Sequence, residues 1–265
     1  MLTITPIPAF NDNYFWLITL KGTQDAYIVD PGDGQIAHNT LIAQQLKLKG
    51  ILVTHRHNDH IGGIDFLLEH YQSTANPIPV YGPDSPPIPQ VTHRLFNQDS
   101  ITLFTHYHFT VLEIPGHTRD HIAYFSKHAQ KEPVLFVGDT LFAAGCGRLF
   151  DGSAEQLYHS LSTLASLPEN TQVYCAHEYT LSNLAFALAV EPDNKAITQR
   201  IKNEQAKREH GLPTIPFSLS IEKQTNPFIR ISEPSVHKSI AEHWGKHYVS
   251  ESELFADLRR WKDGF

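Results

Sequence analysis

The sequence predicts an α/β fold followed by a smaller α-helical domain, and three observations support this. Short apolar runs alternate with helical stretches through the first two thirds of the chain. From Glu178 onward the patterns are helical, with almost no strand pattern. The 265 residues are 41% hydrophobic and 18% charged, which is enough apolar material for a full core and unlike a disordered chain. We therefore expect an α/β domain over residues 1–178 and a helical domain over 179–265.

Strands are expected where short runs rich in β-branched or aromatic residues are bounded by Gly, Pro, Asn or Asp. These runs are Leu2–Ile7, Tyr14–Leu20, Ala26–Val29, Ile51–Thr54, Phe109–Ile114, Ile122–Phe125, Val134–Val137 and Gln172–Cys175. Helices are expected at Ile36–Leu46, Gly62–Tyr71, Ala154–Leu164, Leu181–Val190, Asn194–Glu209 and Glu251–Lys262. Ser153 precedes one of these helices as an N-cap residue. Asn76–Gln90 holds six prolines, which predicts loop or extended chain.

Charge and composition exclude several classes of protein. The chain has 21 Lys+Arg against 28 Asp+Glu, a net charge of −7, which argues against a general nucleic-acid binder. No run approaches the roughly 18 apolar residues that span a membrane, and the N-terminus does not resemble a signal peptide. Two cysteines are too few for a disulfide framework. We therefore expect a cytoplasmic protein, with no membrane or nucleic-acid partner, and a monomer.

Four of the expected strands are followed directly by residues that bind metals. The residues at these strand ends are His55, His57, Asp59, His60, His117, Asp139 and His177. In α/β sheets the carboxyl ends of strands form binding sites, so we expect these side chains to converge. Seven ligands exceed what one tetrahedral ion takes, and they suit two neighbouring ions. Zinc is the expected ion for this set, and iron and manganese accept the same ligands.

The spacing suggests how the ligands divide between the ions. We expect His55, His57 and His117 on one ion, Asp59, His60 and His177 on the other, and Asp139 between both. An extended chain would place His55, His57 and Asp59 on one side by period-two alternation, with His60 pointing elsewhere. Gly62 and Gly63 would let the backbone pass close to the crowded site. Asp30 is expected to support a metal-binding histidine from outside.

The remaining histidines and both cysteines are interpreted as structural or surface residues. These histidines are His38, His70, His93, His106, His108, His121, His128, His159, His210, His237, His243 and His247. Cys175 lies within an apolar run and is expected in the core. Cys146 lies in a Gly-rich run, and a nucleophilic role there is disfavoured because the metal site already supplies a nucleophile.

The segment Thr-His-Arg-His-Asn-Asp-His at 54–60, with His117, Asp139 and His177, resembles the metallo-β-lactamase superfamily. The hallmark of that superfamily is H-x-H-x-D-H on an αββα sandwich, so the resemblance implies this fold. Lactonases, persulfide dioxygenases, RNA-processing nucleases and β-lactamases share the motif, which therefore leaves the substrate open. The commonest β-lactamases lack the final histidine and carry Cys where this chain has Asp139.

Three further segments resemble the glyoxalase II (hydroxyacylglutathione hydrolase) family over essentially the whole chain. They are Asp-Thr-Leu-Phe-Ala-Ala-Gly-Cys-Gly-Arg at 139–148, Ala-His-Glu-Tyr-Thr-Leu-Ser-Asn-Leu at 176–184, and Arg-Arg-Trp-Lys-Asp-Gly-Phe at 259–265. The resemblance implies that Arg148, Tyr179, Arg259 and Lys262 bind the substrate around the glycine carboxylate of glutathione, a role suited to Arg and Lys. Phe150 stands where the family often has Tyr, so a hydroxyl contact to glutathione is missing there.

The implied activity is a binuclear metal-dependent thioesterase that converts S-(2-hydroxyacyl)glutathione, chiefly S-D-lactoylglutathione, to glutathione and D-lactate. Asp59 and Asp139 would orient the hydroxide that attacks the acyl carbon. A thiol has a pKa of about 8.5, so a thiolate leaves without an added acid, and a thioester suits a site with no obvious acid. The alternatives are a mononuclear iron persulfide dioxygenase, another hydrolase of the same fold such as a nuclease, and a non-catalytic metal-binding protein.

Overall fold

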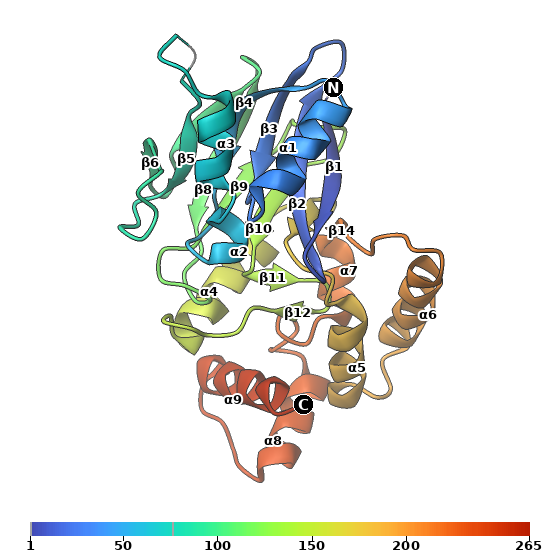
Figure 1. Ribbon diagram of the computed structural model, residues 1–265. Coiled ribbons are helices and arrows are strands. Elements are labelled where there is room, and N and C mark those ends of the chain that lie inside the picture. Colours follow the sequence, from blue (N-terminus) through green and yellow to red (C-terminus); the bar gives the residue numbers. More distant parts are fainter. Residues whose placement is uncertain (1, 76) are drawn as a thin grey trace. The chain divides into compact units, whose positions relative to one another are not determined.

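The computed structural model describes residues 2–75 and 77–265, which fold into two compact units (Figure 1). Unit 1 comprises the chain up to Glu113 together with Asp120–Gly138. Unit 2 comprises Ile114–Arg119 and Asp139–Phe265. Within the described ranges, every helix is too short or too polar to cross a bilayer. Each unit contains some of the strand ends at which the sequence predicts metal ligands.

Unit 1 contains a six-stranded mixed sheet in the order β1-β2-β3-β4-β5-β6. Its strands are β1 (Leu2–Ala9), β2 (Asn13–Leu20), β3 (Asp25–Val29), β4 (Lys47–Leu52), β5 (Val80–Pro83) and β6 (His93–Leu95). The first three strands pair antiparallel, and β3 to β6 pair parallel. Antiparallel neighbours need only short turns, whereas the parallel pairs need crossovers, which here carry α1, α2 and α3.

A second set of antiparallel strands in unit 1 packs against this sheet. These strands are β7 (Ser100–Leu103), β8 (Tyr107–Glu113), β9 (Ile122–Ser126) and β10 (Val134–Gly138). Tyr124 on β9 is fully buried, and its hydroxyl donates to the carbonyl oxygen of Val53 at 2.8 Å, just beyond β4. A buried tyrosine hydroxyl needs such a partner, and this bond joins the two sets of strands.

Helices cover the other face of the first sheet. They are α1 (Gly34–Ala43), α2 (Asn58–Ile61) and α3 (Ile64–Tyr71). Leu41 of α1 and Leu67 of α3 are fully buried in one cluster with Leu17 and Ile28 of the sheet, and both helices lie on the same side of the strands (Figure 1). Burying one such side chain contributes about 1.5–3 kcal/mol, so this face fixes the strand ends that carry the first ligands.

Unit 2 combines two short strand pairs with a helical region. Its strands are β11 (Leu141–Phe142), β12 (Gly145–Cys146), β13 (Gln172–Cys175) and β14 (Phe217–Ser218). Its helices are α4 (Ala154–Ala165), α5 (Thr180–Val190), α6 (Lys195–Glu209), α7 (Leu219–Thr225), α8 (Pro234–Trp244) and α9 (Glu251–Asp263). Ser153 caps α4 in a reciprocal capping box with Gln156, as its position in the sequence predicts.

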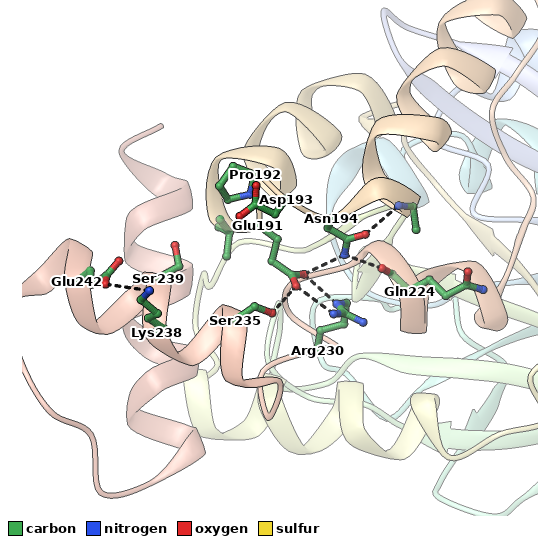
Figure 2. A pocket seen from close by; sticks show the side chains of 12 residues that line it. Glu191, Pro192, Asp193, Asn194, Gln224, Arg230, Ser235, Lys238, Ser239 and Glu242 are labelled. Carbon is green, nitrogen blue, oxygen red and sulfur yellow. Dashed lines mark hydrogen bonds and ion pairs between the residues drawn. The ribbon is translucent and has the colours of Figure 1, made fainter.

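A buried carboxylate holds together the helix ends around a pocket of unit 2 (Figure 2). Glu191 follows α5 and accepts two hydrogen bonds from Arg230, at 2.8 and 3.0 Å, and one from Ser235 at 2.7 Å. Burial would raise the pKa of Glu191, but the donors from Arg230 and Ser235 outweigh it and lower the pKa. Figure 2 shows these side chains converging while Lys238 and Glu242 pair separately on α8. The carboxylate therefore has a structural role.

The predicted fold class is confirmed: mixed sheets with helices are followed by a C-terminal helical region. Details differ from the sequence expectations. The chain is not extended from His55 to Asp59, because α2 begins at Asn58 with His57 as its N-cap. The helix expected over Gly62–Tyr71 is present but begins at Ile64, because Gly62 and Gly63 lie between α2 and α3. The Pro-rich segment Asn76–Gln90, expected as loop or extended chain, contains the short strand β5, and its first residue, Asn76, lies outside the described residues.

Candidate metal centre

Unit 1 presents four of the predicted ligands in and beyond the loop that follows β4. His55 and His57 lie in this loop, and their Nε2 and Nδ1 atoms are 3.0 Å apart. Asp59 and His60 lie on α2, where Asp59 Oδ2 and His60 Nε2 are 3.6 Å apart. Asn13, from β2, donates to Asp59 Oδ2 at 2.9 Å and fixes that carboxylate. Asp59 and His60 are therefore oriented by a helical turn, and not by the extended chain that the sequence predicts.

Asp30 orients two of these histidines. One carboxylate oxygen accepts the backbone N–H of Thr54 at 2.7 Å, and the other accepts the Thr54 hydroxyl at 2.7 Å. Because the Thr54 hydroxyl donates its hydrogen bond to Asp30, it must act as the acceptor for Nδ1 of His55, which lies 3.1 Å away. Asp30 Oδ2 also lies 3.0 Å from Nδ1 of His60. The His55 ring therefore carries its proton on Nδ1, which leaves Nε2 as its metal-binding nitrogen.

The backbone around Asp30 and Gly138 is adapted to this arrangement. Asp30 itself has φ of +51°, a left-handed conformation that costs free energy in a residue other than glycine. Gly138, at the end of β10, has φ of +47°, and a Cβ there would lie 2.3 Å from Thr54 Oγ1. Any side chain at position 138 would clash with the Thr54 hydroxyl. Gly138 is therefore required if this hydroxyl is to keep its hydrogen bond to His55.

Unit 2 brings together the other three predicted ligands. His117 Nδ1 lies 2.8 Å from the carbonyl oxygen of Arg148 and must donate to it, which leaves Nε2 as the nitrogen with a lone pair. This Nε2 is 3.5 Å from Asp139 Oδ2, and Nε2 of His177 is 3.3 Å from the same oxygen. Two imidazole nitrogens thus converge on one carboxylate oxygen, as expected of residues that share a cation.

Gly147 allows this convergence in unit 2. A Cβ at Gly147 would lie 2.0 Å from the backbone oxygen of Asp139 and 2.9 Å from Nδ1 of His117. The Gly-Cys-Gly-Arg segment can therefore pass against both ligands and present the Arg148 carbonyl to His117.

The donor set fits divalent metal ions. The candidate ligands of unit 1 are His55, His57, Asp59 and His60, and those of unit 2 are His117, Asp139 and His177. Neutral imidazole and carboxylate are the ligands that zinc, iron and manganese accept. The hydrogen bonds to the Thr54 hydroxyl and the Arg148 carbonyl fix His55 and His117 in the tautomer that a metal requires. Thiolate is not part of the set, because burial raises the pKa of Cys175 and raises that of Cys146 to about 11.

Sequence reasoning missed the position of His121. This histidine is buried and its ring stacks on His55, with centroids 4.5 Å apart and planes at 17°. The sequence alone places it among the structural or surface histidines, whereas its ring packs on the face of a predicted ligand. The only available signal was its place one residue before β9, four residues after His117.

The residues that the resemblance implies for substrate binding lie in unit 2. Tyr179 stacks on His177 with centroids 4.8 Å apart and planes at 6°. The Arg148 side chain is 72% exposed, whereas Arg259 is 4% exposed and donates from Nη1 to the Cys146 carbonyl at 2.9 Å. Phe150 is exposed, and its ring meets the edge of His117.

Lys262 completes a group of three cations with Arg148 and Arg259. Its Nζ lies 5.3 Å from the centroid of the Phe186 ring and 5.5 Å from that of Phe265, as a cation–π contact requires. Burial lowers the pKa of Lys262, and the guanidinium groups of Arg259 and Arg148 lower it further. Positive charge is therefore in excess at the end of α9, which favours an anionic ligand.

Comparison with known proteins agrees with the fold and the donor set. The model of the metallo-beta-lactamase superfamily matches residues 10–177. The crystal structure of ETHE1 from Myxococcus xanthus has a TM-score of 0.65 and 24% identity, covers 97% of this chain and 90% of its own, and supports the fold. The protein is therefore a metal-dependent hydrolase of the metallo-β-lactamase superfamily, with a divalent metal site formed by histidine and aspartate side chains.

The helical region and the full-length relatives narrow the family. The model described as hydroxyacylglutathione hydrolase C-terminus matches residues 178–265. Hydroxyacylglutathione hydrolases from Shewanella halifaxensis and Aliivibrio salmonicida are 46% and 48% identical to the chain, and each alignment covers 100% of both proteins. The chain belongs to the hydroxyacylglutathione hydrolase family, also known as glyoxalase II, and it is a thiolester hydrolase.

Proposed function

We propose that the protein hydrolyses S-(2-hydroxyacyl)glutathione, chiefly S-D-lactoylglutathione, to glutathione and a 2-hydroxy acid. The observation that carries this proposal is full-length identity of 46–48% to hydroxyacylglutathione hydrolases, including the whole helical region. Cations in that region suit the carboxylate of a glutathione group. A thioester substrate also suits the chemistry, because its thiolate leaves without protonation.

Two divalent ions are proposed as cofactors. His55, His57 and His117 would hold one, Asp59, His60 and His177 the other, and Asp139 would contact both. Zinc is favoured by the mixture of imidazole and carboxylate, and iron or manganese also accept it. When bound, such ions lower the pKa of a coordinated water and polarise a carbonyl oxygen. The chain's part is to hold the Nδ1 protons of His55 and His117 against the Thr54 hydroxyl and the Arg148 carbonyl, and to orient the nucleophile with Asp59 and Asp139.

We also propose that residues 1–178 form the catalytic domain and 179–265 a glutathione-binding domain. The two family models meet between residues 177 and 178, which supports this division. A monomer in the cytoplasm remains our expectation; Cys146 and Cys175 form no disulfide, as is usual in a reducing compartment.

The test is thiol release from S-D-lactoylglutathione, with metal content measured on the same sample. We expect release that requires about two ions per chain, that stops after chelation and that returns when zinc, iron or manganese is added. Release that persists in the metal-free protein would contradict the metal-dependent mechanism. Oxygen consumption with a glutathione persulfide, without thioester hydrolysis, would favour a dioxygenase instead.

Arg259→Ala is expected to raise KM for the thioester far more than it lowers kcat. The reason is that Arg259 belongs to the cation group, and we assign it to recognition and not to attack on the acyl carbon. The matched control is Arg260→Ala, because Arg260 follows directly but pairs with Asp257. Steady-state kinetics on both variants check this, and an unchanged KM for Arg259→Ala would reject its role in binding the substrate carboxylate.

A further inference from the structure

One carboxylate lies among the three cations of unit 2, and the proposed mechanism does not use it. Asp263 Oδ1 lies 3.0 Å from Nη2 of Arg259, as an ion pair, and 3.8 Å from Nε of Arg148. Its side chain is 43% exposed, so a ligand can reach it. The only acidic side chain that pairs with these two arginines in the described chain is therefore at the place where a substrate carboxylate is expected.

Asp263 lies at a helix position that is unfavourable for an acidic side chain, which indicates that its ion pairs with the two arginines stabilise it there. It is the last residue of α9, where the helix dipole is negative and an acidic side chain is unfavourable. Local helix electrostatics would favour a neutral or basic residue. The contacts to Arg259, one turn earlier, and to Arg148, from a distant segment, offset that cost.

The contacts of Asp263 are also weak enough to exchange. The Asp263–Arg148 pair is long and exposed, and exposed pairs contribute about 0–1 kcal/mol. Arg259, by contrast, is held independently by the Cys146 carbonyl and by the ring of Phe228, 5.1 Å from its guanidinium carbon. Arg259 thus keeps its place when Asp263 changes partner, and a carboxylate from outside can take the same donors.

We propose that Asp263 is an internal competitor for the substrate's carboxylate, occupying the Arg259 and Arg148 donors until a glutathione carboxylate exchanges with it. This inference rests on the proposed function and concerns how that site sets its affinity. Asp263 weakens the binding of substrate and of product alike, since both carry the carboxylate. It thereby limits product retention and selects ligands whose carboxylate competes successfully.

Asp263→Asn tests this through the inhibition constant of glutathione, which reports binding directly, and through KM for S-D-lactoylglutathione. We expect both constants to fall about threefold, the scale of an exposed ion pair, with a smaller change at high salt. Glutathione amidated at its glycine carboxylate lacks the competing group, and its inhibition constant is expected to be the same in wild type and variant.

Two further variants separate competition from simple charge or stability effects. Glu253→Gln removes an exposed acidic side chain from the same helix and is expected to leave both constants unchanged. Asp263→Glu keeps the charge and is expected to stay close to wild type. Melting curves confirm that the variants fold. If Asp263→Asn does not fold, Asp263→Ser provides the same comparison.

The outcomes distinguish the inference from the proposed function. A constant that stays unchanged or rises in Asp263→Asn would overturn the inference, because Asp263 would then be indifferent or would position Arg259 for the substrate. An equal fall for the amidated glutathione would also overturn it. If the wild-type protein hydrolyses no glutathione thioester, the proposed function fails, whatever the variants bind.

Discussion

His57→Ala is expected to abolish thioester hydrolysis and metal loading together. His57 precedes α2 and its Nδ1 lies 3.0 Å from Nε2 of His55, so removal of its ring takes a donor from the middle of the predicted set. Loss of a partner that only orients a ligand costs about 10–100-fold in affinity or activity, and loss of a ligand itself should cost more. We expect kcat/KM to fall by well over that range.

The measurement pairs kcat/KM with metal content on the same preparation. His128→Ala is the matched control, because His128 is an exposed histidine of unit 1 outside the predicted ligand set, and it should keep wild-type activity and metal. Retention of full activity by metal-depleted His57→Ala would reject metal-dependent catalysis. If His57→Ala lost its activity but kept all of its metal, His57 would not be a metal ligand.

Candidate metal ligands could be proposed from the sequence because they follow strands, and strands are among the clearest local patterns. ILVT, FTVLEI, VLFV and QVYCA are short, apolar and bounded by polar or glycine residues, and each ends near a His or Asp. The capped helices were equally visible, as with Ser153 and Gln156. In these segments local sequence preference and tertiary packing agree, which is why these strands and helices could be predicted.

Elements governed by long-range contacts could not be predicted. Helix α2 has four residues and no apolar period, and it is positioned by a contact between His60 and Asp30, which lies thirty positions earlier. Helix α8 buries only Val236 and Ile240, too few to mark a helical face. His121 shows the same limit for function, because stacking against His55 depends on how β9 approaches the loop after β4.

The cation group shows where sequence reasoning about function stops. The motif at the end of the chain indicates that charges gather there, and its helical spacing is consistent with Arg259 and Asp263 pairing at i and i+4. It does not reveal that Arg259 is buried, or that the Cys146 carbonyl holds it. Only the fold shows whether a cationic side chain already has partners within the protein, because those partners can come from segments over a hundred residues apart.

Arg200→Ala is expected to be the most destabilising single substitution that we consider. Glu222 on α7 is completely buried, and its Oε1 lies 2.6 Å from Nη2 of Arg200 on α6. Its other oxygen accepts from the backbone N–H of Ala144 at 2.9 Å and from Asn226 at 2.8 Å. Removal of the guanidinium leaves a buried carboxylate without its counter-ion, which costs about 3–5 kcal/mol.

The effect extends toward the metal ligands through this network. Asn226 also donates to the Gly145 carbonyl at 3.0 Å, so Glu222 and Asn226 together hold the β11–β12 hairpin that follows Asp139 directly. Arg200→Ala is therefore expected to lower the free energy of unfolding and to loosen the segment that presents Asp139. Lys202→Ala, at an exposed site on the same helix, should change stability by less than about 0.5 kcal/mol.

The pH dependence of the loss provides a second test. Burial raises the pKa of Glu222, and removal of Arg200, whose charge opposes this, would raise it further. Between the ordinary glutamate pKa and the raised value, the folded state binds the extra proton, so its stability increases as pH falls and decreases as pH rises. Urea unfolding of Arg200→Ala should therefore show the deficit relative to wild type largest at about pH 8 and smaller at about pH 5.

A double variant, Arg200→Met with Glu222→Gln, distinguishes a buried unpaired charge from lost packing. It removes both charges while keeping comparable volumes and an acceptor for the Ala144 N–H, so we expect it to recover much of the stability that Arg200→Ala loses. A double variant no more stable than Arg200→Ala, or a deficit that does not depend on pH, would mean that packing and not the orphaned carboxylate accounts for the loss. Recovery of stability in the double variant would show that the charge pair contributes little net stability, and that its role is to specify how α6 and α7 pack.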